Sequence, residues 1–224
     1  MVGVSIVSHG HCKYLPALLE SLEANDLITS IVIRINDKFL EDEEYLNTLI
    51  LDNRIRIECN EHRLGFGANH NLNSQLIHED YLLILNPDTI LNNLTEIGDL
   101  VVPKVLDQNG NEAENGRKFI SPWNLFLRLS KIKPGSGSEW FGGMGILVSR
   151  QVFNRVSGFD ESYFMYVEDC DFFWRLSKMS IKPTKSQGFL ITHYAQKSSH
   201  KSASYFRRHF RSILVFWGKR YLNI

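Results

Sequence analysis

Short apolar runs alternate with amphipathic runs through the first half of the chain, and this alternation constrains the fold more than any other feature. The pattern predicts strands at residues 2–8, 30–35, 55–59 and 81–85, and helices at 13–24 and 67–78. The polar segment 40–51 is expected to be helical in part. Strands that alternate with helices indicate an α/β domain with a mostly parallel central sheet flanked by helices.

The second half of the chain is patterned less regularly. It predicts strands at 142–148 and 189–192, and helices at 151–156, 168–179 and 205–222. Residues 107–138 contain the turn signals Asn109-Gly110 and Asn115-Gly116. We therefore expect a long loop there, acting as a lid or facing a second substrate, within a single domain.

Charge and cysteine content narrow the class of protein. The 224 residues carry 25 Lys and Arg against 25 Asp and Glu, whereas a general nucleic-acid binder normally has a basic excess. The three cysteines form no C-x-x-C pair, which disfavours a zinc site or a disulfide framework and suits a reducing compartment. The N-terminus reads as a strand, and no apolar run approaches the ~20 residues of a membrane span. We expect a cytoplasmic protein whose contact with a membrane is at most peripheral.

Polar residues follow three predicted strands, at positions 8–11, 36–37 and 86–88. Ligands of a parallel sheet bind outside the carboxyl ends of its strands. Asn86-Pro87-Asp88 is the strongest of these signals, because the apolar run 81–85 delivers a carboxylate that can bind a hard cation such as Mg²⁺. The alternative is an ordinary turn in which Asp88 caps a following helix.

A second candidate site lies at the start of the predicted helix 168–179. Acidic residues at 160, 161, 168, 169 and 171 interleave with the aromatic segment 163–166. The wall of a sugar pocket uses both kinds of side chain, apolar faces under the ring and carboxylates for the hydroxyls. A helix N-terminus that attracts anions would explain the acidic residues alone.

Glycines and histidines provide weaker signals. The small residues of the segment 65–69 let backbone approach a ligand closely, and Arg63 just before it can contact phosphate. A glycine turn before a helix is the plainer explanation. His193 at a strand end, like His9, can bind metal or phosphate or be structural.

Seven short motifs follow one another along almost the whole chain. They are Ile6-Val7-Ser8-His9-Gly10-His11, Gly65-Phe66-Gly67-Ala68-Asn69, Asn86-Pro87-Asp88, Trp140-Phe141-Gly142-Gly143, Gly158-Phe159-Asp160-Glu161, Tyr163-Phe164-Met165-Tyr166-Val167-Glu168-Asp169 and His193-Tyr194. In this order they resemble glycosyltransferase family 2, in its bacterial rhamnosyltransferase-like branch, which builds O-antigen and related surface polysaccharides.

The resemblance implies a single GT-A domain, in which 1–100 binds the nucleotide, 101–200 binds the acceptor and carries catalysis, and 201–224 forms a C-terminal helix. It implies inverting transfer of a hexose, with rhamnose favoured, from a nucleotide diphosphate sugar such as dTDP-rhamnose to a glycan or lipid-linked glycan. It also implies Mg²⁺ or Mn²⁺, with Asp88 as metal ligand and Asp169 as catalytic base.

Other site residues follow from the same resemblance. His193 is expected at the metal or the diphosphate, and Glu168 is expected to hold a sugar hydroxyl or to orient Asp169. The donor site is expected to draw on Ser8, His9, Asn36, Arg63, Gly65, Gly67, Asn86, Trp140 and Gly142. Two departures leave the nucleobase contacts open. Arg34-Ile35-Asn36-Asp37 stands where many members place an aspartate for the base, and the first strand ends in Ser-His-Gly-His rather than Thr-Tyr-Asn.

The proposed base must be ionised to accept a proton. An aspartate with the reference pKa of ~3.9 is ionised at pH 7. The helix N-terminus lowers the pKa of Asp169, whereas the neighbouring charges of Glu168 and Asp171 raise it, so the sequence leaves the balance open.

The predicted C-terminal helix mixes basic with aromatic residues. This composition suits an anionic membrane surface, docking on the domain, or a homodimer contact.

Two other functions fit parts of the chain. A nucleotidyltransferase would share sheet, metal and nucleotide, but residues 8–13 are a poor version of its glycine-rich basic loop. A non-catalytic glycan-binding protein on the same fold is disfavoured because both Asp88 and Asp169 are present.

Overall fold

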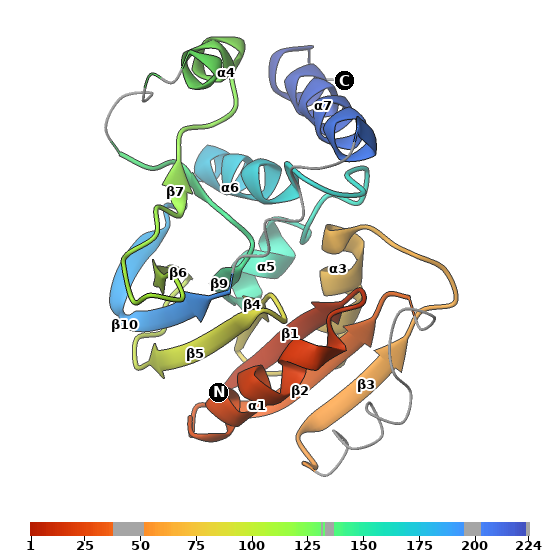
Figure 1. The fold of residues 1–224 in the computed structure, drawn as a ribbon, viewed down its shortest axis with the longest axis vertical. Helices are drawn as coiled ribbons and strands as arrows, with labels where there is room; N and C mark the ends of the chain where they lie inside the picture. Colours follow the sequence, from red (N-terminus) through yellow and green to blue (C-terminus); the bar gives the residue numbers. More distant parts are fainter. Residues whose placement is uncertain (38–51, 131, 133–136, 195–202, 223–224) are drawn as a thin grey trace.

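The computed structural model describes residues 1–37, 52–130, 132, 137–194 and 203–222 (Figure 1). The helical segment expected at 40–51 lies outside the described residues. The strands are β1 (Val2–Ser8), β2 (Ile28–Ile35), β3 (Ile55–Cys59), β4 (Tyr81–Leu85), β5 (Thr89–Leu94), β6 (Leu100–Leu106), β7 (Gly116–Arg117), β8 (Trp140–Phe141), β9 (Gly145–Ser149) and β10 (Thr184–His193). The helices are α1 (Leu15–Glu23), α3 (Phe66–Leu76), α4 (Pro122–Leu129), α5 (Arg150–Arg155), α6 (Glu168–Lys178) and α7 (Ala203–Trp217), with a 3₁₀ turn at Cys12–Tyr14 and a π turn at Gly218–Leu222.

One eight-stranded sheet runs through the domain in the order β3-β2-β1-β4-β9-β6-β10-β5. The first four strands in this order pair in parallel, which confirms the α/β fold predicted from the alternation. β9 is antiparallel to both β4 and β6, and β5 is antiparallel to β10. Because β1, β2 and β4 are parallel, their carboxyl ends meet at one edge of the sheet, where polar residues were expected.

Apolar side chains of the sheet alternate between two covered faces. In β4, Leu83 and Leu85 join a core cluster with the buried leucines of α1, whereas Leu82 and Ile84 join a second cluster with Phe172 of α6. Successive strand residues point to opposite faces, so a continuous apolar run requires helices on both sides. The sheet is therefore buried on two faces, and only its edges and strand ends are available for chemistry.

The second half of the chain contains more regular structure than its sequence pattern predicts. β5 and β6 were not predicted, because β5 carries Asn92 and Asn93 and β6 contains Pro103, all poor strand formers. The loop expected at 107–138 is interrupted by β7 and α4. A local signal for α4 was available, since Ser121 precedes Pro122 and its Oγ accepts a hydrogen bond from the Asn124 N–H at 3.0 Å.

α4 and α7 lie together at one end of the molecule, at the top in Figure 1. The indole Nε1 of Trp217 in α7 donates to the carbonyl of Ile120, just before α4, at 3.0 Å. None of the helices in the described part of the chain has the length and hydropathy that a bilayer crossing requires.

Candidate active site

Asp88 lies just beyond the carboxyl end of β4, as its sequence position predicted. The Asn86 N–H donates to the carbonyl of Met144 at 3.3 Å, and the carbonyl of Asp88 accepts the Tyr194 N–H at 2.9 Å. The chain then enters β5 at Thr89, so Asp88 caps no helix. Backbone contacts on both sides thus hold Asp88 at the end of β4.

His193 is the nearest polar partner of this carboxylate. β10 pairs with β5 so that His193 lies opposite Thr89, and the Nε2 of His193 is 3.5 Å from Oδ1 of Asp88. One oxygen and one imidazole nitrogen from different strands therefore converge. No group of three or more His, Cys, Asp or Glu able to hold a metal occurs in the part of the chain that the structure describes. A cation at this pair would need further oxygen ligands from a substrate or water, as Mg²⁺ commonly has.

Asp169 occupies the first turn of α6. Its Oδ1 accepts the Cys170 N–H at 2.8 Å, and its Oδ2 accepts the Gly143 N–H at 3.2 Å. Burial raises the pKa of Asp169 to about 6, although these backbone hydrogen bonds and Arg117 act in the opposite direction. The balance that the sequence left open is therefore dominated by burial, and the carboxylate is ionised at pH 7 while still basic enough to accept a proton.

Glu168, the residue before it, lies in a less polar setting. Its side chain is buried, and its Oε2 has no hydrogen-bond partner. Burial and the charge of Asp169 raise the pKa of Glu168 to about 8. Burial thus raises the pKa of both neighbouring carboxyl groups, and the charge of Asp169 adds to the rise at Glu168.

A strained turn aims these two residues. Tyr166 and Val167 have φ values of 70° and 73°, a region that a β-branched residue rarely adopts. Val167 precedes the first residue of α6 and is buried in the core. Backbone strain of this kind persists only where the surrounding packing enforces it, and it concentrates at functional sites.

One short segment joins the two candidate sites. Gly143 donates its N–H to Asp169, while the next residue, Met144, accepts the Asn86 N–H at the base of the Asp88 turn. Gly142, one residue earlier, donates to Asn115 Oδ1 at 3.0 Å. The segment 142–144 therefore contacts the backbone of Asn86, two residues before Asp88, on one side and the carboxylate of Asp169 on the other.

Gly65 and Gly67, which were expected to let a ligand approach, instead pack against residues 159–164 of the same chain. A Cβ at Gly65 would lie 2.7 Å from the carbonyl oxygens of Tyr163 and Phe164, and one at Gly67 would lie 2.6 Å from the Cβ of Phe159. The Phe66 N–H also donates to the carbonyl of Phe164 at 3.1 Å. The absent side chains let the start of α3 pack against residues 159–164, which in turn places the loop before Asp169.

The residues after β2 form a polar cluster with the loop before α3. Arg63 forms an ion pair and a hydrogen bond with Asp37, which is buried. Asn36 accepts the Leu64 N–H at 2.8 Å and donates to the Leu64 carbonyl at 3.0 Å. The sequence placed Asp37 at this edge together with Asn36 but assigned it no role in the site. The signal was its position directly after a strand that pairs with β1.

The remaining predicted donor residues lie around the same edge. Ser8 is buried at the end of β1, where its Oγ accepts the His11 N–H at 3.2 Å, and His9 lies partly buried beside it. Trp140 is buried in the core, and its Nε1 donates to the carbonyl of Lys118 at 2.8 Å. The indole thus packs inside the domain, away from the donor site where the sequence placed it.

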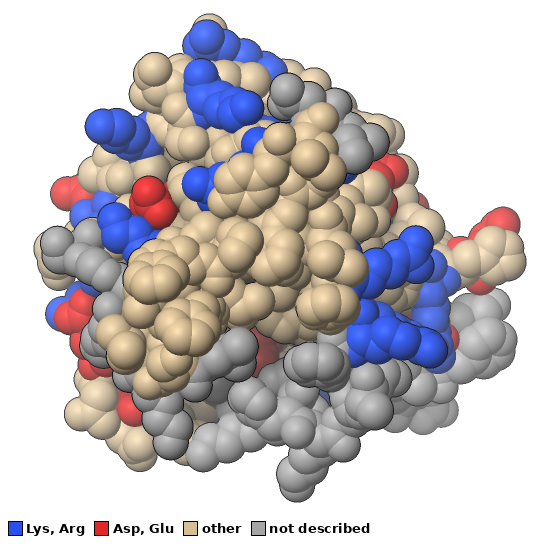
Figure 2. Space-filling model, turned by 90° about the horizontal axis from the view of Figure 1, so that it is seen from above, with Lys and Arg blue, Asp and Glu red and all other residues tan. Residues whose placement is uncertain are grey.

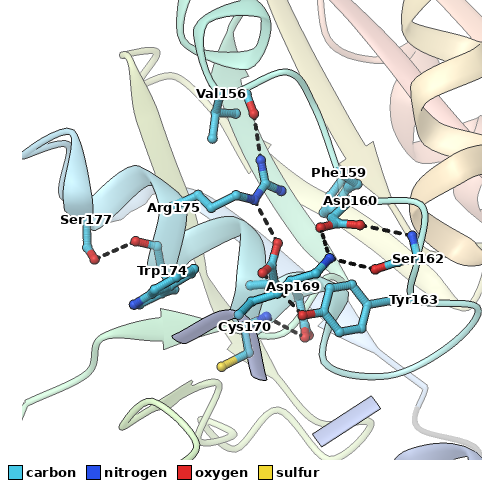
Figure 3. Close-up of polar contacts among 12 residues, drawn as sticks. Val156, Phe159, Asp160, Ser162, Tyr163, Asp169, Cys170, Trp174, Arg175 and Ser177 are labelled. Atoms are coloured by element: carbon cyan, nitrogen blue, oxygen red, sulfur yellow. Dashed lines mark hydrogen bonds and ion pairs between the residues drawn. The ribbon is translucent and has the colours of Figure 1, made fainter. Parts of the chain in front are cut away.

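Buried polar contacts fix the back of α6 (Figure 3). Arg175 donates through Nε to Asp171 Oδ2 at 2.7 Å and through its guanidinium to the carbonyl of Val156 at 2.6 Å. The Tyr163 hydroxyl donates to Asp171 Oδ1 at 3.3 Å. Asp171 therefore has a structural role and ties α6 to the 156–163 segment, whereas Asp169 contacts the Gly143 N–H.

Structural comparison defines the class of protein. GalNAc-T7, whose crystal structure contains UDP, GalNAc and Mn²⁺, matches with a TM-score of 0.70 at 15% identity over 98% of this chain. S. aureus TarS 1–349 in complex with UDP-GlcNAc matches with a TM-score of 0.62 at 13% identity over 96% of this chain. The matched regions are 49% and 65% of those two chains, so this chain spans half to two thirds of their length. The fold is that of the GT-A glycosyltransferases.

Sequence comparison narrows the class further. Rhamnosyltransferase WbbL of Escherichia coli (strain K12) is 33% identical in an alignment of 242 positions that covers 94% of this chain and 89% of that protein. An N-acetylglucosaminyl-diphospho-decaprenol L-rhamnosyltransferase of Mycobacterium tuberculosis is 32% identical over 105 residues, 45% of this chain and 34% of that protein. No family model matches the chain. The chain belongs to the bacterial rhamnosyltransferase-like branch of glycosyltransferase family 2.

Proposed function

We propose that this protein is a metal-dependent, inverting rhamnosyltransferase of bacterial surface polysaccharide synthesis. The observation that carries the proposal is the segment 142–144, which contacts Asp169 on one side and the Asp88 turn on the other. A metal-dependent sugar transferase needs a cation site for the departing nucleotide and a base for the incoming alcohol. Both must reach the same bound sugar. Asp88 lies near an imidazole, which suits a cation site. Asp169 accepts backbone N–H groups and has a raised pKa, which suits a base.

The cation site would be formed by Asp88 and His193. Their donor set, one carboxylate oxygen and one imidazole nitrogen 3.5 Å apart, fits Mg²⁺ or Mn²⁺ completed by diphosphate oxygens and water. A divalent ion there would supply positive charge to the diphosphate of the donor. Asp88 lies between β4 and β5, and His193 ends β10, the strand that pairs with β5.

Asp169 would accept the proton of an acceptor hydroxyl as the hydroxyl oxygen attacks the anomeric carbon from the face opposite the diphosphate. The N–H groups of Gly143 and Cys170 hold its carboxylate in place. The raised pKa of Glu168 favours its protonated form, which would donate a hydrogen bond to a sugar oxygen or to Asp169. General-base catalysis is most efficient when the pKa of the base lies near the working pH, and a pKa of about 6 for Asp169 is close to it.

The donor would lie along the carboxyl ends of β1, β2 and β4. Asp37 and Arg63 form the charged wall of this edge, and Ser8 and Asn36 shape its floor. Relatives named as rhamnosyltransferases favour rhamnose as the sugar, and the family resemblance favours dTDP as the nucleotide. The acceptor would be a glycan or lipid-linked glycan, because one relative is named for a diphospho-decaprenol substrate.

The experiment that tests this proposal incubates the full chain with a panel of nucleotide sugars, a glycolipid acceptor and Mn²⁺ or EDTA. Release of nucleoside diphosphate, strongest with dTDP-rhamnose and lost in EDTA, is the expected result. Release of pyrophosphate instead would identify a nucleotidyltransferase. Binding of a nucleotide sugar without release of any nucleotide, whichever acceptor is added, would favour a glycan-binding protein. A thermal-shift panel of the same sugars reports binding independently of turnover.

A further inference from the structure

α4 and α7 form one continuous surface at the end of the molecule beyond the active site. Ile120, Asn124 and Leu125 from the α4 side face His209 and Ile213 of α7 across a cavity of only 30 Å³. The Trp217–Ile120 hydrogen bond and the guanidinium of Arg220 over the ring of Phe119, at 5.5 Å, hold the two segments together. The inner sides of both helices are therefore used for packing, and their outer sides face away from the domain.

The outer sides carry large apolar residues. Trp123 and Phe126 of α4 are 66% and 57% exposed, and their rings stack with centroids 5.7 Å apart. Phe210 and Leu214, one turn apart on α7, are 48% and 49% exposed. Two adjacent helices thus present aromatic and aliphatic side chains to solvent, whereas scattered single residues are the norm on soluble surfaces.

The charges of this surface are of one sign. In the sequence, no Asp or Glu occurs between Arg117 and Ser138, and none follows Asp171. Arg207, Arg208 and Arg211 of α7 are exposed. Figure 2 looks onto this end and shows a broad uncharged area bordered by Lys and Arg, with Asp and Glu mainly towards its margins. The basic residues of α7 therefore have no acidic neighbours within their own segment of the sequence.

A pocket of 320 Å³ opens beside the apolar area. It is lined by Ser162, Phe164, Met165, Arg208, Arg211, Ser212 and Val215. Two guanidinium groups with serine hydroxyls suit phosphate oxygens, and the apolar lining suits the hydrocarbon next to a phosphate. The Arg208 guanidinium lies over the ring of Phe164, with its carbon 5.4 Å from the ring centroid.

We propose that the surface formed by Trp123, Phe126, Phe210, Leu214 and the arginines of α7 docks on a bilayer of anionic phospholipid. Aromatic and aliphatic groups that enter the interface, with basic residues around them, are the composition by which amphipathic helices bind such membranes. A second copy of the chain is a poorer occupant, because an isologous contact would bring the same arginines of two α7 helices together.

This docking would set the active site close to the membrane. The Ser212 hydroxyl of α7 donates to the carbonyl of Met165 at 3.0 Å, and residue 165 lies in the loop that leads into Asp169. This contact joins the inner side of α7 to the loop that precedes the proposed base. A lipid-linked acceptor could therefore present its sugar to Asp169 while its hydrocarbon stays in the bilayer, a consequence that rests on the proposed function.

The test is co-sedimentation of the full chain with vesicles of phosphatidylcholine, with and without phosphatidylglycerol. We expect tight binding only to the anionic vesicles and weaker binding at high salt. Arg207→Gln combined with Arg211→Gln should weaken that binding about 25-fold, since each basic residue near an anionic surface contributes about 1 kcal/mol, or about fivefold. Trp123→Ala combined with Phe126→Ala should weaken it as well, by removing the inserted rings.

A matched control removes the same charge elsewhere. Arg56→Gln combined with Lys185→Gln changes exposed residues of β3 and β10 and should leave vesicle binding unchanged. Equal binding of the Arg207/Arg211 variant and the parent chain would overturn the proposal. So would a concentration-dependent dimer that the Trp123/Phe126 variant abolishes, because the surface would then belong to a second copy. Sugar transfer to a water-soluble acceptor should survive in all variants, so failure of vesicle binding is distinct from failure of the proposed function.

Discussion

The backbone N–H of Gly143 donates a hydrogen bond to Oδ2 of Asp169 at 3.2 Å, joining the loop before β9 to the start of α6. A Cβ at Gly143 would lie 3.1 Å from the ring of Phe66 and 3.9 Å from the Cβ of Asp169. The close approach leaves room for little more than the hydrogen atom of glycine. A backbone N–H therefore holds the carboxylate of Asp169 in place. A backbone donor does not depend on the side chain at its own position, so the proposed base is preorganised.

Replacing this carboxylate should remove the proposed base without removing the fold. Asp169→Asn keeps the shape of the side chain and can still accept the Gly143 N–H, but it cannot take a proton. General-base catalysis typically contributes about 10²–10⁴-fold, so kcat should fall by that factor while donor affinity is retained. Steady-state kinetics and donor titration of the same preparation measure both quantities. An Asp169→Asn enzyme with full kcat would rule out Asp169 as the base.

The raised pKa of Asp169 predicts the pH dependence of the reaction. With its pKa raised to about 6, the carboxyl group is protonated and inactive as a base below that value. The rate constant kcat/KM should therefore rise about tenfold per pH unit up to about pH 6 and level off above it. An aspartate with an ordinary pKa would give a flat profile between pH 5 and pH 8. Measuring kcat/KM at constant ionic strength across this range distinguishes the two cases.

Glu168 should make the fold less stable as the pH rises. Its pKa is raised to about 8 in the folded protein, so between an unfolded value of 4.5 and 8 the folded state holds a proton that the unfolded chain has lost. Stability contributed by this group is complete below about pH 4.5 and is lost as the pH rises towards 8. Glu168→Gln removes the titration, and its free energy of unfolding should gain about 2–4 kcal/mol on the parent between pH 5 and pH 8.

Urea unfolding at the two pH values measures this difference. The exposed Glu20→Gln on α1 is the control, and it should follow the parent at both values. If Glu168→Gln and the parent lose stability in parallel from pH 5 to pH 8, the buried carboxyl group is not protonated as described.

The proposed cation pair makes a separate prediction about donor binding. Asp88→Asn keeps the turn but removes the charged oxygen, and Mn²⁺-dependent affinity for the nucleotide sugar should fall by about 10–100-fold. His193→Gln should have a smaller effect in the same direction, because the carboxylate carries the charge. Calorimetric titration with Mn²⁺ and again with EDTA separates the two contributions. An Asp88→Asn protein that still shows the full Mn²⁺ enhancement would place the cation elsewhere.

The sequence predicts Asp88 and Asp169 as candidate residues, but not how they are held. Each follows a strong local signal: the apolar run before Asn86-Pro87-Asp88, and the acidic turn that opens α6. Their relation depends on the segment 142–144, whose contacts span 58 residues to Asn86 and 26 to Asp169 in sequence separation. Such pairings are set by tertiary packing, which local pattern does not encode.

The strands that the sequence fails to predict contain residues of low strand propensity. β5 and β6 lack alternation because polar residues and Pro103 are tolerated where neighbouring strands supply the packing. Gly65 and Gly67 are explained by contact with residues 159–164, far away in the chain, and the local motif alone suggested a ligand. The sequence places Asp37 at the end of a strand but does not predict its ion pair with Arg63, because Arg63 follows a different strand.

A last prediction concerns the polar residue beneath the donor edge. Asn73 of α3 is fully buried; it donates to Ser5 Oγ at 3.0 Å and to the carbonyl of Ile6 at 3.1 Å, and it accepts from Arg34 Nε at 2.8 Å. Asn73→Leu keeps the volume but leaves the buried guanidinium of Arg34 without this acceptor. An unsatisfied buried charged group costs more than a neutral one, so the free energy of unfolding should fall by about 3 kcal/mol.

The control for this variant is Asn154→Leu on the exposed side of α5, which should change the free energy of unfolding by less than about 0.5 kcal/mol. Arg34 also donates to Asn60 Oδ1 at 3.1 Å, and Asn60 in turn donates to Asn36 at 2.9 Å. The loss at Asn73 should therefore reach the donor edge, and Asn73→Leu should weaken nucleotide-sugar binding where Asn154→Leu does not. Unchanged stability in Asn73→Leu would mean that the Arg34 guanidinium finds another acceptor and that this network does not support the site.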